Sequence, residues 1–147
     1  MENKKLLRGA LVYAKKLNEL CCVKNGFIAV NNGVVEASGD FSDMPKAYQN
    51  AQILDYSDSI IIPSFVDMHL HAPQYPMLGM GMDLPLLDWL NAYTFKTEAQ
   101  YKNEAFARES YASLASALIA RGTTRVVMFS SIHVGATLIL MEELEKA

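Results

Sequence analysis

From residue 64 onward the chain alternates between strand-like and helix-like segments, and this alternation constrains the fold more than any other feature. The apolar run at 65–70 predicts a strand, and the β-rich run at 124–130 predicts a fully buried strand. Apolar residues at helical spacing lie between them, and residues 138–146 predict a further helix. Two successive strand–helix units favour a parallel sheet covered by helices. Two units alone leave an open apolar sheet edge, so we expect the chain to be the front part of a larger fold.

Capping residues predict where the helices of this zone begin and end. A loop rich in proline and glycine, residues 73–81, precedes an apolar helix-like segment at 84–90. Thr97 is a candidate N-cap, with Gln100 three residues later as its capping-box partner. Gly122 is a natural C-terminal cap. The pattern therefore predicts one long helix between Thr97 and Gly122.

The first 60 or so residues are predicted to form small β structure. Two apolar runs flank Asn32 and Gly33, and this pair favours a tight hairpin turn because both residues tolerate positive φ. An apolar run at 60–62 predicts a buried strand that ends before Pro63. We therefore expect two domains, a small β domain at 1–62 and the start of the strand-and-helix domain at 63–147.

Composition and charge exclude several classes of function. Hydrophobic residues make up 51% of the 147 residues, which is enough for a packed core. The net charge of −3, without a strong basic patch, makes nucleic acid an unexpected partner. The only two cysteines, Cys21 and Cys22, are adjacent, so we expect a reduced, cytoplasmic protein. No signal peptide is expected, and the longest uncharged run, 126–141, is too short to cross a membrane.

Candidate metal ligands lie at the end of the first predicted strand. Side chains alternate along a strand, so Asp67, His69 and His71 are expected on one face. If that face is a barrel interior, both imidazoles lie at the C-terminal end of the strand, where barrel active sites form, and they can share a divalent metal such as zinc. The alternative is two ordinary histidines that face solvent or bond to neighbours. Asp67 lies deeper and is expected to be a buried helper that bonds to backbone or orients a ligand.

The segment "IIPSFVDMHLH" resembles the first barrel strand of the amidohydrolase superfamily, whose usual form is P-G-F-V-D-x-H-x-H. Residues 69–98, "HLHAPQYPMLGMGMDLPLLDWLNAYTFKTE", are more narrowly similar to guanine deaminases. In those enzymes H-x-H-A-x-Q-Y is followed by D-L-P-L-L-x-W-L and then Y-T-F-x-x-E. "RGTTRVVMFSSIH" also resembles the second strand of the family.

The resemblance implies a fold, a reaction and a set of site residues. The fold would be a (β/α)8 TIM barrel with a small β-sandwich built from both chain ends, of which this chain holds the β segment and the first two βα units. The reaction would be metal-dependent hydrolytic deamination of guanine to xanthine and ammonia. His69 and His71 match the first two metal ligands, with Zn2+ expected and Fe2+ as the alternative. Gln74 matches a glutamine that hydrogen-bonds the purine.

Other functional residues of the family lie on later strands, beyond Ala147. These are a histidine and an aspartate that ligate the metal and a glutamate that acts as general acid and base, so no catalytic residue is expected in this chain. His133 is expected to have a local structural or substrate-loop role. Trp89 could lie beside the purine or at a subunit contact, although a core position together with Leu86 and Leu87 is favoured.

Two alternatives to a guanine deaminase stay open. The first is a related amidohydrolase acting on another heterocycle, of the pterin or cytosine deaminase type, although Gln74, Tyr75 and "DLPLLDWL" favour guanine. The second is a truncated, non-catalytic chain. For the complete enzyme, the resemblance implies a small purine substrate, no membrane partner and a homodimer.

Overall fold

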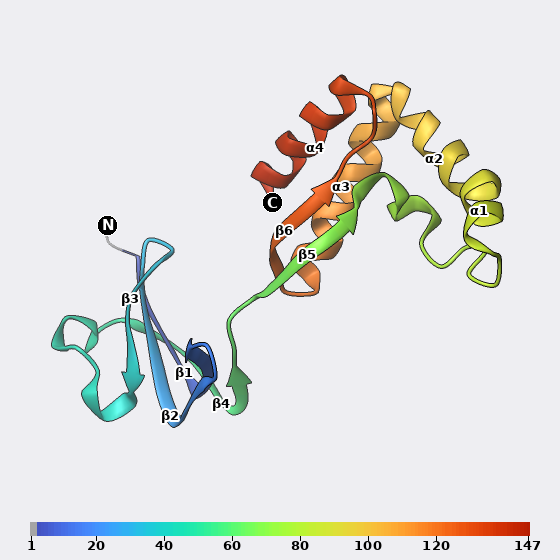
Figure 1. Ribbon diagram of the computed structural model, residues 1–147. Coiled ribbons are helices and arrows are strands. Elements are labelled where there is room, and N and C mark those ends of the chain that lie inside the picture. The colour runs from blue at the N-terminus through green and yellow to red at the C-terminus, as the bar shows by residue number, and fades with distance from the viewer. Residues whose placement is uncertain (1–2) are drawn as a thin grey trace. The chain divides into compact units, whose positions relative to one another are not determined.

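The computed structural model describes residues 3–147, and the chain divides into two compact units, Met1–Pro63 and Ser64–Ala147 (Figure 1). The first unit is mostly β structure. Its strands are β1 (Lys4–Lys16), β2 (Glu19–Asn31), β3 (Val34–Asp40) and β4 (Gln52–Ile61), and two short 3-10 helices, η1 (Phe41–Asp43) and η2 (Lys46–Tyr48), connect β3 to β4.

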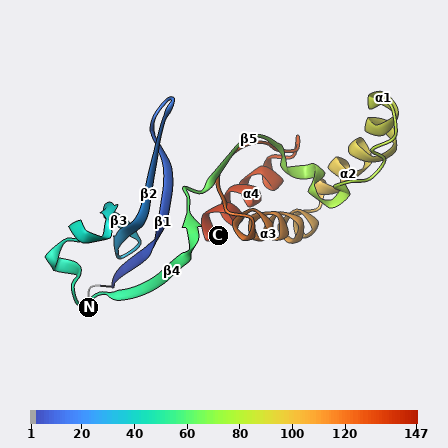
Figure 2. The same cartoon turned by 90° about the horizontal axis from the view of Figure 1, so that it is seen from below.

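A four-stranded sheet in the order β3-β2-β1-β4 forms the first unit. β1 pairs antiparallel with β2 and parallel with β4, and Figure 2 shows β1 and β2 as a long hairpin. The predicted Asn-Gly turn is confirmed, because β2 and β3 pair antiparallel and both Asn32 and Gly33 have positive φ. The run predicted as a buried strand at 60–62 lies at the end of β4, which stops at Ile61, but Ile60 and Ile62 are exposed, so the predicted burial is wrong. The buried cluster of this unit consists of Leu6, Phe27, Ala29 and Tyr48.

The second unit alternates strands and helices, as the sequence predicts. Its elements are β5 (Phe65–His71), the 3-10 helix η3 (Ala72–Met77), α1 (Leu86–Trp89), the π-helix η4 (Leu90–Thr94), α2 (Phe95–Ala99), the 3-10 helix η5 (Gln100–Lys102), α3 (Glu104–Ala120), β6 (Thr123–Phe129) and α4 (Val134–Lys146). β5 and β6 pair in parallel, which confirms the expected βα units. α4 begins at Val134, earlier than the predicted residue 138.

Helices α3 and α4 lie on one face of the β5–β6 pair (Figures 1 and 2). Leu70 of β5 and Met128 of β6 pack against a buried cluster built mainly from these two helices. The members of the cluster are Ala72, Tyr101, Ala107, Tyr111, Leu114, Ala136, Ile139 and Leu140. Burial of this apolar surface is the main force that holds the unit together. Within the described residues, no helix is long and apolar enough to cross a membrane.

Helix α3 begins at a different residue from the predicted one. Thr97 lies inside α2, so its prediction as the N-cap is wrong. The N-cap is Asn103, whose Oδ1 accepts hydrogen bonds from the backbone N–H groups of Ala105 and Phe106. The difference arises because the chain is already helical before Thr97 and turns only at Asn103, where φ is −85° and ψ is 110°. The predicted end is confirmed, because Gly122 has a φ of +77° directly after the helix.

The two candidate caps differ in their expected contribution to stability. Asn103→Ala should lower the free energy of unfolding by about 1 kcal/mol, because two N–H groups in the first turn of α3 lose their acceptor. Thr97→Ala should change it by less than about 0.5 kcal/mol, because Thr97 caps no helix. Urea unfolding followed by circular dichroism measures both values. Equal losses from the two substitutions would contradict the assignment of the cap.

Candidate functional site

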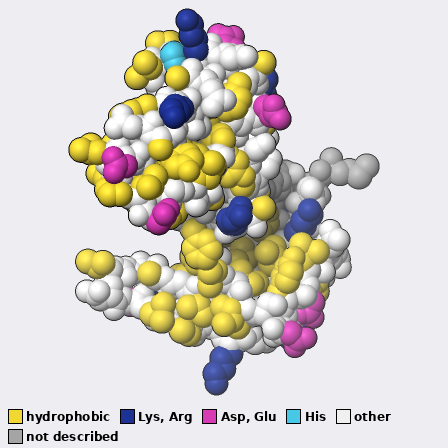
Figure 3. Space-filling view, turned by 90° about the vertical axis from the view of Figure 1, so that its right-hand side faces the viewer, with side chains coloured by type: hydrophobic (Ala, Val, Ile, Leu, Met, Phe, Trp, Pro, Cys, Tyr) yellow, Lys and Arg dark blue, Asp and Glu magenta, His cyan; other side chains and the backbone are white. Residues whose placement is uncertain are grey.

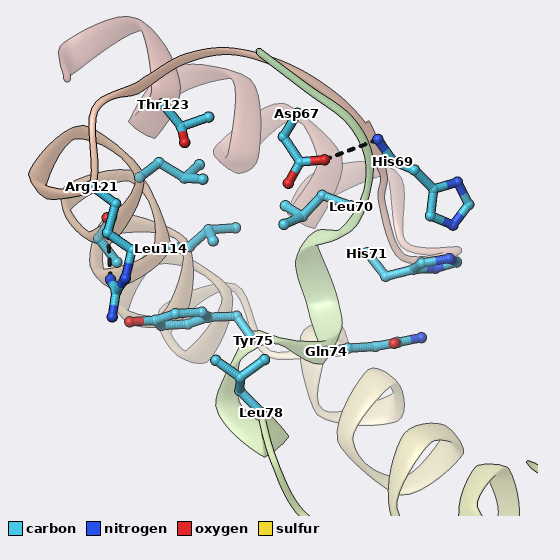
Figure 4. A pocket seen from close by; sticks show the side chains of 12 residues that line it. Asp67, His69, Leu70, His71, Gln74, Tyr75, Leu78, Leu114, Arg121 and Thr123 are labelled. Carbon is cyan, nitrogen blue, oxygen red and sulfur yellow. Dashed lines mark hydrogen bonds between the residues drawn. The ribbon is translucent and has the colours of Figure 1, made fainter. Parts of the chain in front are cut away.

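The histidine pair, His69 and His71, lies at the C-terminal end of β5. The two ring centroids are 5.1 Å apart with the rings nearly edge to face. Phe129, at the end of the neighbouring strand β6, stacks on His71 at 4.7 Å and meets His69 edge-on at 5.3 Å. Figure 4 shows both imidazoles on the same side of β5. The two imidazoles and the Phe129 ring therefore lie together at the C-terminal ends of β5 and β6.

The spacing of the histidine pair suits a shared metal ion. Two imidazoles on one tetrahedral zinc, each with a zinc–nitrogen bond of about 2.0–2.1 Å, place their ring centroids roughly 5 Å apart. Both side chains are exposed, so a metal can reach them. Within the described residues, no group of three or more His, Cys, Asp or Glu side chains could hold a metal by itself. The pair thus fits half of a zinc shell, and further ligands are needed.

A β-bulge lies just before the histidine pair. Asp67 pairs with Val126 and Leu70 pairs with Met128, so three steps along β5 match two steps along β6. Val126 and Met128 share the face that packs on the helices, and their partners in β5 lie on that face too. Asp67 therefore points away from the histidine pair (Figure 4). The expectation that Asp67 shares their face is wrong, because the extra residue breaks strict alternation.

Asp67 nevertheless acts on the histidine pair through the backbone. Its Oδ1 accepts a hydrogen bond of 3.0 Å from the backbone N–H of His69. A residue in a bulge loses its regular ladder partner, so a side-chain acceptor satisfies an N–H group that the sheet leaves unbonded. This contact agrees with the expected role of Asp67 as a helper that bonds to backbone.

A cavity of about 460 Å³ lies beside the histidine pair. One wall comes from β5 and η3 and includes His69, His71 and Gln74, and the other comes from α3 and includes Leu114 and Arg121 (Figure 4). The volume lies within the range of small-molecule sites. Figure 4 shows the side chains of His69, His71 and Gln74 on the same side of this wall, and they point away from Leu114 and Arg121.

Gln74 lies in η3, directly after the strand, and lines this cavity. Its Nε2 donates a hydrogen bond of 3.1 Å to Oε1 of Glu98 in α2. No role for Glu98 is predicted from the sequence, although Glu98 is the last residue of the Y-T-F-x-x-E pattern. Spacing alone could not reveal the contact, because it joins two residues that are 24 positions apart.

Two buried tyrosines lie near Glu98. The Tyr101 hydroxyl and the Ser110 hydroxyl form a hydrogen bond of 2.6 Å. Burial raises the pKa of Tyr101 to about 12, the hydrogen bond with Ser110 opposes this rise, and the Coulomb interactions with Tyr111 and Glu98 add to it. Burial also raises the pKa of Tyr111. Both phenols therefore stay protonated at neutral pH.

Trp89 lies on a different hollow from the histidine pair. Its Nε1 donates a hydrogen bond of 2.8 Å to the carbonyl oxygen of Met80, and the hollow beside it is lined by Met82 of the preceding loop and Leu86 of α1. Leu86 is 67% exposed, Leu87 is 71% exposed and Trp89 is only partly buried, so the expected core position of these side chains is wrong. α1 follows a long loop, and no side chain of this helix is buried within the described residues. Figure 3 shows hydrophobic side chains at the surface on this side of the chain.

His133 is the N-cap residue of α4 and lies outside the cavity wall. Its backbone N–H donates a hydrogen bond of 3.2 Å to the Ser131 hydroxyl, and its carbonyl oxygen accepts from Thr137. These contacts agree with the local structural role that the sequence predicts.

Known proteins share sequence and fold with this chain. Residues 60–147 match the amidohydrolase family. The guanine deaminase of Dictyostelium discoideum is 29% identical over 157 residues, which cover 97% of this chain and 35% of that protein. The crystal structure of guanine deaminase from C. acetobutylicum with bound guanine is 39% identical, with a TM-score of 0.86 over 98% of this chain and 34% of that one.

A more distant solved structure also shares the fold. The adenosine deaminase from Xanthomonas campestris with bound zinc is 24% identical, with a TM-score of 0.71 over 94% of this chain and 31% of that one. This chain thus spans about a third of the length of the proteins that it matches. The (β/α)8 fold class expected from the sequence is confirmed for the part that the chain covers. The chain belongs to the amidohydrolase family.

Proposed function

We propose that this chain forms the N-terminal part of a guanine deaminase, an enzyme that hydrolyses guanine to xanthine and ammonia. The observation that carries the proposal is that the histidine pair and Gln74 line one cavity, within the continuous match to guanine deaminases at residues 69–98. The similarity to a guanine deaminase whose structure contains guanine supports the same substrate.

Each of these side chains has a role in the proposed reaction. His69 and His71 would hold a divalent metal, and zinc fits their nitrogen donors and their spacing. When bound, the metal would activate water for attack on the ring carbon that carries the amino group. Gln74 would hydrogen-bond the edge of the purine and hold it against the histidine pair. The general acid and base, and the remaining ligands, would come from later barrel strands.

Two further properties of the complete enzyme belong to the proposal. We expect a homodimer, and exposed apolar side chains such as Leu78, Met82 and Leu87 offer surface for contacts. We expect a cytoplasmic location, because Cys21 and Cys22 are free thiols rather than disulfide partners. Sedimentation and cell fractionation test these two expectations independently of the activity.

Replacing either member of the histidine pair should remove the metal. In the complete enzyme, His69→Ala and His71→Ala should each reduce zinc from about one ion per chain to near none, because the ion loses one of its few protein ligands. Elemental analysis after dialysis measures the zinc content. His133→Ala serves as the control and should retain zinc, because His133 contributes backbone contacts at the start of α4. Full zinc content in both pair variants would show that other residues hold the metal.

Replacing Gln74 should weaken the reaction of guanine without loss of metal. Gln74→Ala leaves a buried purine edge without its partner, which costs about 1–3 kcal/mol in transition-state binding. Steady-state kinetics on guanine, with cytosine and a pterin as comparison substrates, measures the change in kcat/KM. Gln100→Ala is the matched control, because Gln100 is exposed in η5. Unchanged turnover of guanine by Gln74→Ala would remove the best residue of the assignment.

Residues 1–147 alone should have no deaminase activity. The described residues supply two imidazoles and no third ligand nearby, so zinc affinity should be poor. The general acid and base is also missing, so proton transfer lacks its agent. The test is to express these residues alone, add zinc and assay xanthine formation. A soluble monomer that deaminates guanine would contradict the proposed division of the site, whereas activity regained on mixing with the rest of the barrel would support it.

A further inference from the structure

We propose that Glu98 is a positioning residue that fixes the side-chain amide of Gln74, so that the amide oxygen Oε1 faces the substrate. The proposal rests on the proposed function, since it concerns how Gln74 binds a heterocycle. Its basis is the hydrogen bond of 3.1 Å from Gln74 Nε2 to Glu98 Oε1, which joins η3 to α2. Within the described residues, the structure gives Oε1 of Gln74 no hydrogen-bond donor, and Gln74 lines the cavity beside the histidine pair.

The carboxylate of Glu98 decides which end of the Gln74 amide it meets. A primary amide has a donor end and an acceptor end of nearly equal size, and its side chain can present either end to a neighbour. An ionised carboxylate only accepts hydrogen bonds, so it bonds to Nε2 and repels Oε1. With Glu98 in place, the flipped orientation would bring two oxygen atoms together. Glu98 therefore leaves Oε1 of Gln74 as the acceptor available to a ligand.

The surroundings of Glu98 hold its carboxylate in position. Residues 86–102 form a continuous helical segment that includes the π-helix η4, and π-helical turns occur frequently at functional sites. Thr94, one turn before Glu98, is buried. Tyr101 and Tyr111 are buried close enough for the charge of Glu98 to raise the pKa of both hydroxyls, in addition to the larger effect of burial. Gln74 and Glu98 are both partly buried, which limits competition from water for the hydrogen bond between them.

This orientation has a consequence for substrate recognition. The edge of the heterocycle that faces Oε1 of Gln74 must carry an N–H group, because an oxygen acceptor does not bind a bare ring nitrogen. Guanine offers N–H groups on its ring and on its amino substituent. An amide free to flip would accept either kind of edge equally well. Glu98 thus contributes to specificity without touching the substrate.

A double-mutant cycle in the complete zinc-loaded enzyme tests whether Glu98 acts through Gln74. Glu98→Gln can both donate and accept, so it should no longer select one orientation of the amide. We expect it to lower kcat/KM for guanine by about tenfold, mainly through KM, with zinc content unchanged. In the Gln74→Ala background, Glu98→Gln should cause no further loss. Glu145→Gln, at an exposed position on α4, is the matched control and should match the unmutated enzyme.

The outcomes separate this proposal from the proposed function. If the unmutated enzyme does not deaminate guanine, the proposed function fails. The proposal is overturned if the unmutated enzyme deaminates guanine but Glu98→Gln leaves kcat/KM unchanged. It is also overturned if Glu98→Gln lowers kcat/KM by the same factor in the unmutated enzyme and in the Gln74→Ala enzyme, because Glu98 then does not act through Gln74.

A swap of the two side chains gives a second test that needs no activity and remains decisive if Glu98→Gln alone does not fold. Gln74→Glu should lower Tm, because two carboxylates then face each other. Combining it with Glu98→Gln restores a donor opposite an acceptor, so Tm should recover most of the loss. Thermal unfolding of the three proteins measures this recovery. A combined variant no more stable than Gln74→Glu alone would show that the two side chains make no direct contact, and would overturn the proposal.

Discussion

Parallel strands cannot be joined by a tight turn, because the chain must return to the starting end of the sheet before the second strand begins. In this protein the chain leaves β5 at His71 and enters β6 at Thr123. The connection carries both Gln74 and Glu98, and it packs helix α3 against the sheet. The parallel ladder also brings Phe129 beside the histidine pair. The site therefore depends on this ladder more than on any single contact within it.

Local patterns predicted those features of the fold that depend on neighbouring residues. The apolar runs predicted β5 and β6, the Asn-Gly pair predicted a hairpin turn, and Gly122 predicted the end of α3. Each of these depends on backbone preferences within a few residues, which a single sequence displays. The same holds for the spacing of the histidine pair on one strand face.

Features that depend on the tertiary structure could not be predicted in this way. Thr97 has the residue type of an N-cap, but the preceding helical segment continues past it, and the chain turns only at Asn103. Asp67 fails the alternation rule because an extra residue interrupts the ladder in β5. The role of Glu98 depends on a partner in a different element. In all three cases, packing or pairing overrides a local preference.

The face of β5 and β6 opposite the helices has a consequence for synthesis of the proposed complete enzyme. Phe65, Met68 and Phe129 are each more than half exposed in this chain. Relatives are about three times as long, so translation of the remainder, at roughly 5–20 residues per second, takes on the order of tens of seconds. During that interval the apolar face and the free edge of β5 have no barrel strand to cover them. A ribosome-associated chaperone that shields apolar segments would protect the nascent chain until the later strands emerge.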